Sequence, residues 1–292
     1  MTAGDPFRLE PRPIRRAFEH ASVGYDAHAV LAGRVREELL ARLELLAFEP
    51  AVVLDLGCGT GHGARALKER WRKARVVALD ASAGMLRAAR RQTSWRRRFA
   101  RVRADGLALP LAAASVDLVY SNLMLPWSVD LDAQLRELRR VLAPRGYVTF
   151  STLGPDTLLE LRAAWSEVDS TAHVHRFLDM HDVGDALVRA GFADPVMDVD
   201  RYTLTYPDLA RLHADLRGVG SRNALAGRSG GLTGRSRLAR VAAAYERHRD
   251  AEGRLPASCE IIYGQAWCPG ATPPVRGRRG EVVVALDSIR RR

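Results

Sequence analysis

The sequence predicts an α/β fold in which helices cover both faces of a mainly parallel β-sheet. Short apolar, β-favouring segments alternate along the chain with segments whose apolar residues recur at helical spacing. Residues 76–79 are apolar throughout, which is typical of a parallel strand buried on both faces. Glycines at every second position, Gly57, Gly59 and Gly61, follow the first predicted strand and indicate a ligand-binding turn.

The rest of the chain is organised around the first predicted strand and its glycine turn. The strand, residues 52–56, includes Asp55, and a helix begins at Ala64 after the glycines. Glycine permits positive φ angles and lets a ligand approach the backbone. The free N–H groups of the turn and of the helix N-terminus favour a carboxylate or another electron-rich group. The spacing excludes a dinucleotide fingerprint, since His62 stands at its third glycine, and no Gly-Lys-Ser/Thr follows as in a phosphate loop.

Acidic residues lie at the ends of the first three predicted strands. Asp55 belongs to the first, Asp80 ends the second, and Asp105 follows the third. Ligands of open α/β folds bind at the carboxyl ends of the strands, so we expect these aspartates at one rim. Asp80 is placed to accept two hydrogen bonds from a ribose, and Asp105, with the backbone at Gly106, to contact an adenine.

Two more residues are expected near this rim. Met85 lies on the first turn of the helix after Asp80, where it can pack against an adenine or belong to the core like any methionine. Ser82 is a better cap for that helix than Asp80. Asn122 ends the fourth predicted strand and reaches the same rim.

The remaining elements follow from periodicity and turn signals. A loose arm, residues 1–13, precedes a helix that begins at Ile14 and is interrupted near Gly24. The other expected helices span 30–46, 64–71, 131–142, 157–168, 180–190, 209–216 and 236–252, and the strands span 52–56, 75–80, 100–104, 115–122, 147–153, 195–206 and 257–267, with a turn at 143–146.

These elements divide the chain into four parts. We expect an N-terminal arm with lid helices in residues 1–47 and a nucleoside-binding core in residues 48–153. Residues 154–268 complete the sheet and carry a helical insertion between the last two strands. Residues 269–292 form a basic C-terminal tail.

Composition is that of a globular protein with a sizeable core. The 292 residues are 47% hydrophobic, and the net charge of +11 favours either an acidic partner or an arginine-rich chain from a GC-rich genome. Three separated cysteines without a CxxC pair argue against a disulfide framework and a zinc site. The chain shows neither a signal sequence nor a long apolar run, so we expect a soluble cytoplasmic protein without a membrane partner.

The pattern D-x-G-x-G-x-G from Asp55 resembles that of S-adenosylmethionine (SAM) dependent methyltransferases. Within them, nearly the whole chain resembles the malonyl-acyl carrier protein O-methyltransferases of biotin synthesis. Departures from that family's pattern are Gln265, where histidine is expected, and Ser128, where cysteine is common. The matching stretches are residues 18–26, 55–61, 121–127, 150–161, 173–177, 179–185, 190–198, 203–206, 253–256, 263–264 and 266–267.

The resemblance implies a Rossmann-like, seven-stranded class I SAM methyltransferase fold. It also implies methyl transfer from SAM to the free carboxylate of a malonyl thioester on acyl carrier protein, or of malonyl-CoA. A carboxylate is already ionised at pH 7 and needs no general base. The cofactor-binding residues expected on this basis are Asp55, Gly57, Gly59, Gly61, Asp80, Met85, Asp105, Gly106 and Asn122, and no metal is expected.

The carboxylate of the substrate needs a positive or hydrogen-bonding partner. Arg201 and Arg217 are candidates, although either arginine can equally belong to a solvated face or a structural ion pair. Tyr25, next to Asp26, can orient the carboxylate or close the lid, or lie in a surface turn. The arginines of residues 218–249 can meet an acidic carrier protein, or form an ordinary solvated face.

Two other functions remain open at this point. One is that of the complex I assembly hydroxylases, which share the fold and a similar Ser-Asn-Leu stretch but act on a protein arginine. The other is a nucleic-acid methyltransferase or binding module, suggested by the net charge of +11. Against it, the chain has neither an Asn-Pro-Pro-Tyr motif nor a basic patch interleaved with aromatic residues.

Overall fold

The computed structural model describes residues 7–46, 48–94, 97–228, 231 and 233–270. Among them, seven strands form one sheet in the order β3-β2-β1-β4-β5-β7-β6. Strands β1 to β5 pair in parallel, and β7 is antiparallel to both of its neighbours. The predicted fold is therefore confirmed. The strands are β1 (Val52–Leu56), β2 (Arg75–Asp80), β3 (Ala100–Arg103), β4 (Val116–Asn122), β5 (Leu142–Leu153), β6 (Ala193–Tyr206) and β7 (Leu255–Trp267).

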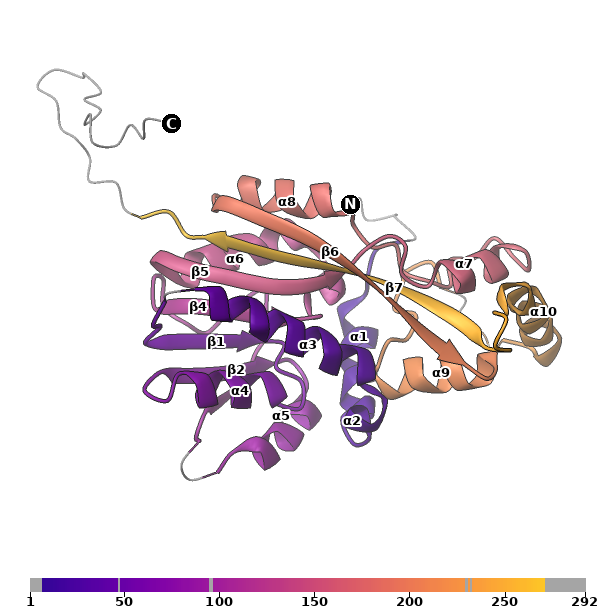
Figure 1. The fold of residues 1–292 in the computed structure, drawn as a ribbon, viewed down its shortest axis with the longest axis horizontal. Coiled ribbons are helices and arrows are strands. Elements are labelled where there is room, and N and C mark those ends of the chain that lie inside the picture. Colours follow the sequence, from indigo (N-terminus) through magenta and orange to yellow (C-terminus); the bar gives the residue numbers. More distant parts are fainter. Residues whose placement is uncertain (1–6, 47, 95–96, 229–230, 232, 271–292) are drawn as a thin grey trace, which may run out of the picture.

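Helices cover both faces of the sheet (Figure 1). Helices α3 (Val30–Arg42) and α4 (His62–Arg70) bury Val35, Leu39 and Leu67 in one core. Helices α6 (Leu131–Val141) and α8 (Met180–Arg189) pack into a second core on the other face. The shorter α5 (Ala83–Ala89) follows β2, and the side chain of Ser82 caps it by accepting a hydrogen bond from the N–H of Met85.

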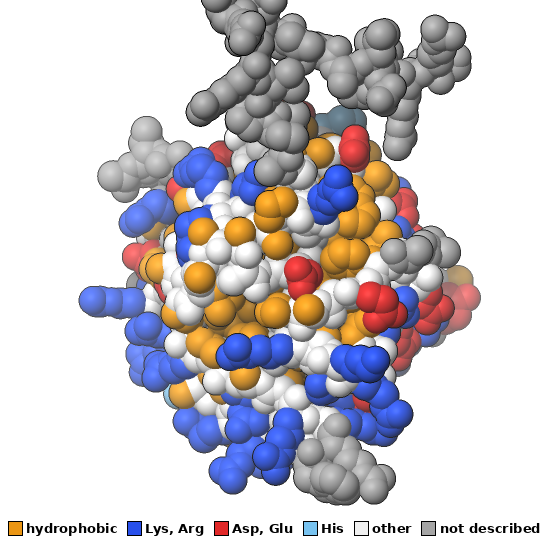
Figure 2. Space-filling view, turned by 90° about the vertical axis from the view of Figure 1, so that its left-hand side faces the viewer, with side chains coloured by type: hydrophobic (Ala, Val, Ile, Leu, Met, Phe, Trp, Pro, Cys, Tyr) orange, Lys and Arg blue, Asp and Glu red, His pale blue; other side chains and the backbone are white. Residues whose placement is uncertain are grey.

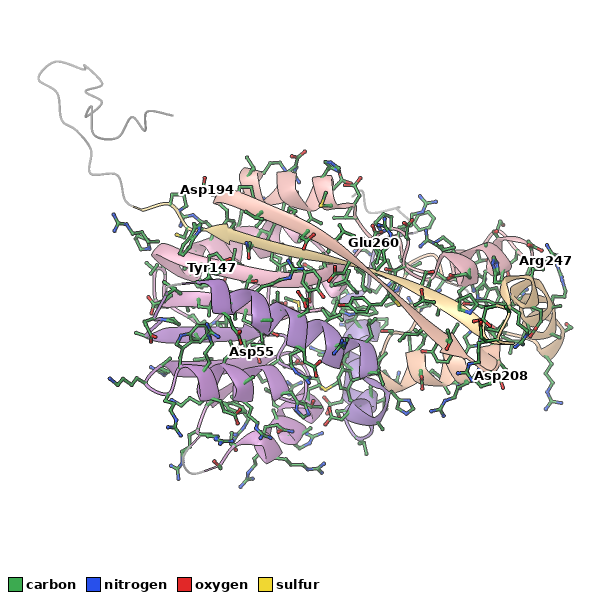
Figure 3. All side chains as sticks on the ribbon, viewed as in Figure 1. Asp55, Tyr147, Asp194, Asp208, Arg247 and Glu260 are labelled. Atoms are coloured by element: carbon green, nitrogen blue, oxygen red, sulfur yellow. The ribbon has the colours of Figure 1, made fainter. Side chains whose placement is uncertain are left out.

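Strands β6 and β7 extend as a two-stranded ribbon beyond the carboxyl ends of the parallel strands (Figure 1). The extension packs against α7 (Leu159–Ser166), α9 (Leu209–Gly218) and α10 (Arg235–Tyr245). Trp165, Leu212 and Tyr245 belong to the separate core of this region. Figure 3 labels Glu260 near the point where β6 and β7 overlap in this view. Its buried carboxylate accepts a hydrogen bond from the N–H of Asp156.

The N-terminal segment differs from the expected loose arm. Helix α1 (Pro11–Ala21) begins inside the predicted arm, and Leu9 forms a β-bridge with Leu225. The N–H of Glu10 also donates to the carbonyl of Ala224. The sequence does not reveal this pairing because the partner lies more than two hundred residues away. The predicted interruption near Gly24 is confirmed, and the short helix α2 (Tyr25–His28) follows it.

Other differences are confined to element ends. The expected turn at residues 143–146 lies inside β5, where Arg145 has φ 64° and the register with β4 shifts. The helices predicted at 157–168 and 236–252 are shorter, and the latter ends at Tyr245 before a 3-10 turn. No described helix combines the length and apolar character that a membrane crossing requires. Most of the predicted tail, residues 271–292, lies outside the described residues.

Candidate active site

The glycine turn after β1 has positive φ at all three glycines, 69° at Gly57, 52° at Gly59 and 86° at Gly61. A Cβ on Gly57 would lie 2.3 Å from the Cγ of Met124, and one on Gly61 would lie 2.8 Å from the Cβ of Ala89. A Cβ on Gly59 would meet nothing within 4 Å. Two glycines therefore allow close packing of the turn, and the middle one faces open space.

A first cavity, enclosing about 440 Å³ including its open mouth, lies at this turn. It opens at the carboxyl ends of β1 and β4, the point where the strand order reverses and where open α/β sheets bind ligands. One side is the turn and the strand ends, and the other is the N-terminal helical segment. The lining residues are Tyr25, Asp26, Ala29, Ala32, Arg36, Asp55, Gly57, Cys58, Gly59, Thr60, His62, Gly63, Tyr120 and Asn122.

Three polar groups at this cavity lack hydrogen-bond partners among the described residues. They are the Oδ2 of Asp55, the hydroxyl of Tyr120, and the guanidinium of Arg36. Figure 3 shows Asp55 in the sheet beneath α3, the helix that carries Arg36. Burial raises the pKa of Asp55 to about 7, and the nearby charge of Arg36 opposes this shift. An acceptor and a cation in one cavity complement a zwitterionic amino acid, such as the methionine part of SAM.

Asp80 braces the turn from the end of β2. Its carboxylate accepts hydrogen bonds from the N–H of Gly59 at 2.9 Å and of Ser82 at 2.8 Å. Burial raises the pKa of Asp80. Burial raises the pKa of Tyr25 to about 12, and the nearby negative charge of Asp80 contributes to this increase. Tyr25 is thus a protonated hydroxyl on the cavity wall near Asp80.

The other residues expected at the cofactor are placed differently. Met85 is 1% exposed and lies in the core, which is the second of the two positions expected for it. Asp105 is exposed and accepts a hydrogen bond from the N–H of Leu107, and the carbonyl of Gly106 accepts one from Gln134. Gly61, Asp80, Met85, Asp105 and Gly106 do not line the first cavity.

Asn122 does line the first cavity, but its amide is used within the protein. Its Nδ2 donates to the carbonyl of Ala32 at 3.0 Å, and its Oδ1 accepts from the hydroxyl of Ser151. Asn122 therefore attaches α3 to the ends of β4 and β5.

Hydrogen bonds join the N-terminal segment to the elements around the cavity. Asp26 accepts from the hydroxyl of Thr60 at 2.6 Å. Glu19 accepts from the hydroxyl of Ser82 and from the N–H of Gly84, and these bonds hold the pKa of Glu19 at about 2. On the other side, His28 pairs with Asp215 of α9 at 2.8 Å. The segment is therefore a wall of the site, held at both of its sides.

A second cavity, enclosing about 870 Å³ including its open mouth, lies beyond this wall. Neighbouring residues of the N-terminal segment line both cavities, Ala29 and Ala32 the first and His28 and Leu31 the second, so the two cavities adjoin at this segment. Most of the lining is apolar. The lining residues are His28, Leu31, Trp127, Leu153, Thr157, Leu158, Leu161, His173, Val174, His175, Phe177, Leu204, Tyr206, Leu212, Asp215, Leu216, Val219, Ser221, Arg222, Asn223, Ala257 and Cys259.

Neither arginine expected at the carboxylate lines a cavity. Arg201 is exposed and pairs with Asp156 and Glu260 at 3.6 and 3.5 Å. It projects from the face of β6 opposite to Leu204, because side chains alternate along a strand. Arg217 is exposed on α9. Arg201 thus has the structural ion pairs, and Arg217 the solvated position, that were the alternatives, and a role of either residue at the carboxylate stays a prediction.

Two other arginines lie at the cavities: Arg36, which sequence reasoning missed, and Arg222, one of the arginines of residues 218–249 expected to meet an acidic carrier protein. Arg36 lines the first cavity and exposed Arg222 lines the second, and the guanidinium of neither has a hydrogen bond or ion pair among the described residues. A signal for Arg36 was present in the small residues Ala29 and Ala32, which share its helix face at a spacing of three or four.

Positive charge is also abundant away from the cavities. Figure 2 views the amino ends of the parallel strands, where Lys and Arg side chains gather below a central area of hydrophobic side chains. The net charge of +11 therefore does not by itself mark one docking surface.

Replacement of Arg36 by Gln should weaken SAM binding at least about tenfold, because a hydrogen bond to a charged group contributes about 1.5–3 kcal/mol. Arg34→Gln is the matched control, since exposed Arg34 on the same helix pairs with Glu37. Isothermal titration calorimetry measures both dissociation constants. Equal affinities for the two variants would contradict a role of Arg36 in the site.

SAM binding should release a proton at pH 6. The pKa of Asp55, raised from 3.8 to about 7, leaves its carboxyl largely protonated at that pH, and a bound ammonium group favours the ionised form. Affinity should consequently increase as the pH rises to about 7 and then level off. Calorimetry in two buffers with different ionisation enthalpies measures the release, and Asp55→Asn should abolish it. An unchanged release in that variant would show that another group supplies the proton.

Comparison with known proteins assigns the family. The family described as "Methyltransferase domain" matches residues 54–150. A SAM-dependent methyltransferase of Thermotoga maritima has the same fold, with a TM-score of 0.52 at 16% identity, and the match covers 87% of this chain and 99% of that one.

Two curated relatives are named malonyl-(acyl-carrier protein) O-methyltransferase. The protein of Halorhodospira halophila is 48% identical over 100% of this chain and 99% of its own length. That of Methylovorus is 50% identical over 93% of each chain. At this identity over its whole length, the chain belongs to the malonyl-(acyl-carrier protein) O-methyltransferase family.

Proposed function

We propose that this protein transfers the methyl group of SAM to the free carboxylate of a malonyl thioester held on acyl carrier protein. One observation supports this most: a cavity with a cationic and an acidic group adjoins a largely apolar cavity, and neighbouring residues of one helical segment line both. The first suits an amino-acid zwitterion and the second suits a thioester with its long linker. The names of the curated relatives indicate the same reaction.

The first cavity has the groups to hold SAM. Asp55 and Tyr120 would accept from the amino group or contact it, and Arg36 would bind the carboxylate. Gly59, whose Cβ direction is open, would allow the ligand to approach the turn. The ribose would meet Asp80, and the adenine would lie toward Asp105 and Gly106. When bound, SAM supplies a methyl group already activated by its sulfonium.

The remaining task of the protein is to align the substrate. Orientation alone can provide effective molarities of about 10⁵ M or more. Tyr25 is suited to orient the carboxylate, because its hydroxyl stays protonated at neutral pH and can donate a hydrogen bond. It lines the first cavity three residues before His28, which lines the second. No proton has to be removed from an ionised carboxylate, so the site requires no general base.

Arg222 suits the phosphate of the prosthetic arm rather than the reacting carboxylate. It is exposed, whereas the reacting carboxylate must lie where the two cavities adjoin, in contact with the SAM methyl group. A phosphopantetheine arm with its thioester end inside would carry its phosphate toward the open mouth. Arginine binds phosphate through charge-assisted hydrogen bonds.

The alternative functions have less support. The curated relatives named above carry neither a hydroxylase nor a nucleic-acid name. Acyl carrier protein and coenzyme A both present a phosphopantetheine arm, and the preference for the carrier protein rests on the family.

The function is tested by mass spectrometry of malonyl-acyl carrier protein after incubation with the protein and SAM. The expected product gains one methyl group. Asp80→Asn should reduce product formation by weakening SAM binding, while Asp194→Asn, at the far end of the sheet (Figure 3), should leave it unchanged. Absence of the methyl ester from the wild-type reaction would contradict the proposal.

Replacement of Arg222 by Ala should raise the KM for malonyl-acyl carrier protein about tenfold, because a charge-assisted bond to phosphate is lost. With malonyl-pantetheine, which lacks the phosphate, the same variant should match the wild type. The SAM affinity of the Arg222→Ala variant should equal that of the wild type. An equal loss with both substrates would place the role of Arg222 elsewhere.

A further inference from the structure

His175 lies in the segment between α7 and α8 and lines the second cavity. It is 8% exposed. Its ring makes an edge contact with Trp127 at a centroid distance of 5.1 Å, and Trp127 makes another with Phe18 of α1 at 5.2 Å. Trp127 follows β4, the strand that brings Asn122 to the first cavity. His175 is therefore linked through Trp127 to the segment that follows β4.

The hydrogen bonds of His175 determine its tautomer. The Nε2 lies 3.2 Å from the backbone nitrogen of Ala224, and a backbone N–H can only donate. Nε2 is therefore the acceptor, and the neutral ring carries its proton on Nδ1. Burial lowers the pKa of His175 to about 4, so the ring is neutral at physiological pH.

The Nδ1–H of His175 is an unused donor. It has no hydrogen-bond partner among the described residues. Unlike the hydroxyl of Tyr120, it is not fully buried. The other imidazoles of the cavity are engaged, His28 with Asp215 and His173 with Asp169. Asn223 likewise uses both ends of its amide within the protein.

We propose that the Nδ1–H of His175 binds the malonyl carboxylate, donating to the oxygen that does not take the methyl group. The inference rests on the proposed function and identifies a substrate-binding residue for it. That oxygen is an acceptor in the carboxylate and remains one, as the ester carbonyl, in the product. The attacking oxygen forms the new O–CH3 bond as the S–CH3 bond breaks, and the bonding electrons stay on sulfur.

A neutral donor suits this reaction better than a cation. A carboxylate anion and a sulfonium cation become a neutral ester and a neutral thioether, so charge disappears in the transition state. A guanidinium on the carboxylate would stabilise the charged ground state more than the transition state, and only the reverse accelerates the chemical step. A neutral imidazole orients the carboxylate with less of this penalty.

Two substitutions separate the cavity bond from the structural bond. His175→Gln places an acceptor near the position of Nε2 for the N–H of Ala224 but removes the donor at Nδ1. His175→Asn retains a donor near Nδ1 and removes the acceptor at Nε2. The first variant should raise the KM for malonyl-acyl carrier protein at least about fivefold, and the second should stay within about threefold of the wild type. Exposed His20→Gln is the control and should change nothing.

Steady-state kinetics give KM and kcat, calorimetry gives the SAM affinity, and thermal unfolding reports the fold. The proposal requires that SAM affinity and the unfolding midpoint of His175→Gln remain those of the wild type while its KM rises. A wild-type KM in His175→Gln overturns it, as does a KM that rises equally in both variants together with a lower midpoint. No methylation by the wild type would instead refute the proposed function.

The wild-type protein allows a second measurement that needs no variant. Nitrogen NMR should show the His175 ring protonated at Nδ1 at pH 7. Malonyl-pantetheine, added with S-adenosylhomocysteine, should shift that proton downfield. A ring protonated at Nε2, or a signal that malonyl-pantetheine leaves in place, overturns the proposal.

Discussion

The site depends on the attachment of the glycine turn to the end of β2. The N–H groups of Gly57 and Cys58 both donate to the carbonyl of Leu79, and the N–H of Gly59 donates to the Asp80 carboxylate. The turn is thereby held against the neighbouring strand by three bonds. Only glycine fits at its first and third positions, where Met124 and Ala89 leave no room for a Cβ. The position of every other group at the first cavity is set relative to this turn.

The N-terminal helical segment transmits that position to the second cavity. Asp26 is bonded to Thr60 of the turn, Glu19 to the start of α5, and His28 to α9. Gly218 of α9 lies so close to the ring of His28 that a Cβ would approach it to 2.3 Å. One segment therefore forms a side of both cavities, and its few polar bonds fix the distance between them. Alignment of two reactants depends on this distance more than on any group that moves a proton.

Much of the fold could be predicted because its signals are local. The strand of residues 76–79 is apolar on both faces. The glycines before Ala64 permit the positive φ angles of a tight turn. The placement of Arg36 and His175 was not predictable in the same way. Their roles depend on which distant element lies opposite, Asp55 for the first and Ala224 for the second.

The position of Arg201 illustrates a different limit of sequence-based prediction. Tyr202, Leu204 and Tyr206 alternate with more exposed residues along β6, so strand periodicity already places Arg201 on the outer face. The charge of an arginine suggested a ligand, and the period of the strand would have argued against it. Met85 shows the converse limit: a helix turn gives its position along the element, but packing places its side chain in the core.

The distribution of charge along the two cavities is consistent with a reaction that consumes charge. Arg36 lies in the first cavity and Arg222 is exposed on the second, whereas the segment at which the cavities adjoin presents Ala29, Leu31 and Ala32. Attraction between opposite charges is stronger where the surroundings polarise less, so apolar surroundings favour their combination. A cation placed there would hold the carboxylate in its ionised form. With a cation in each cavity and neutral groups where the cavities adjoin, the site would bind both reactants. It would do so without stabilising the separated charges at the point where the reactants meet.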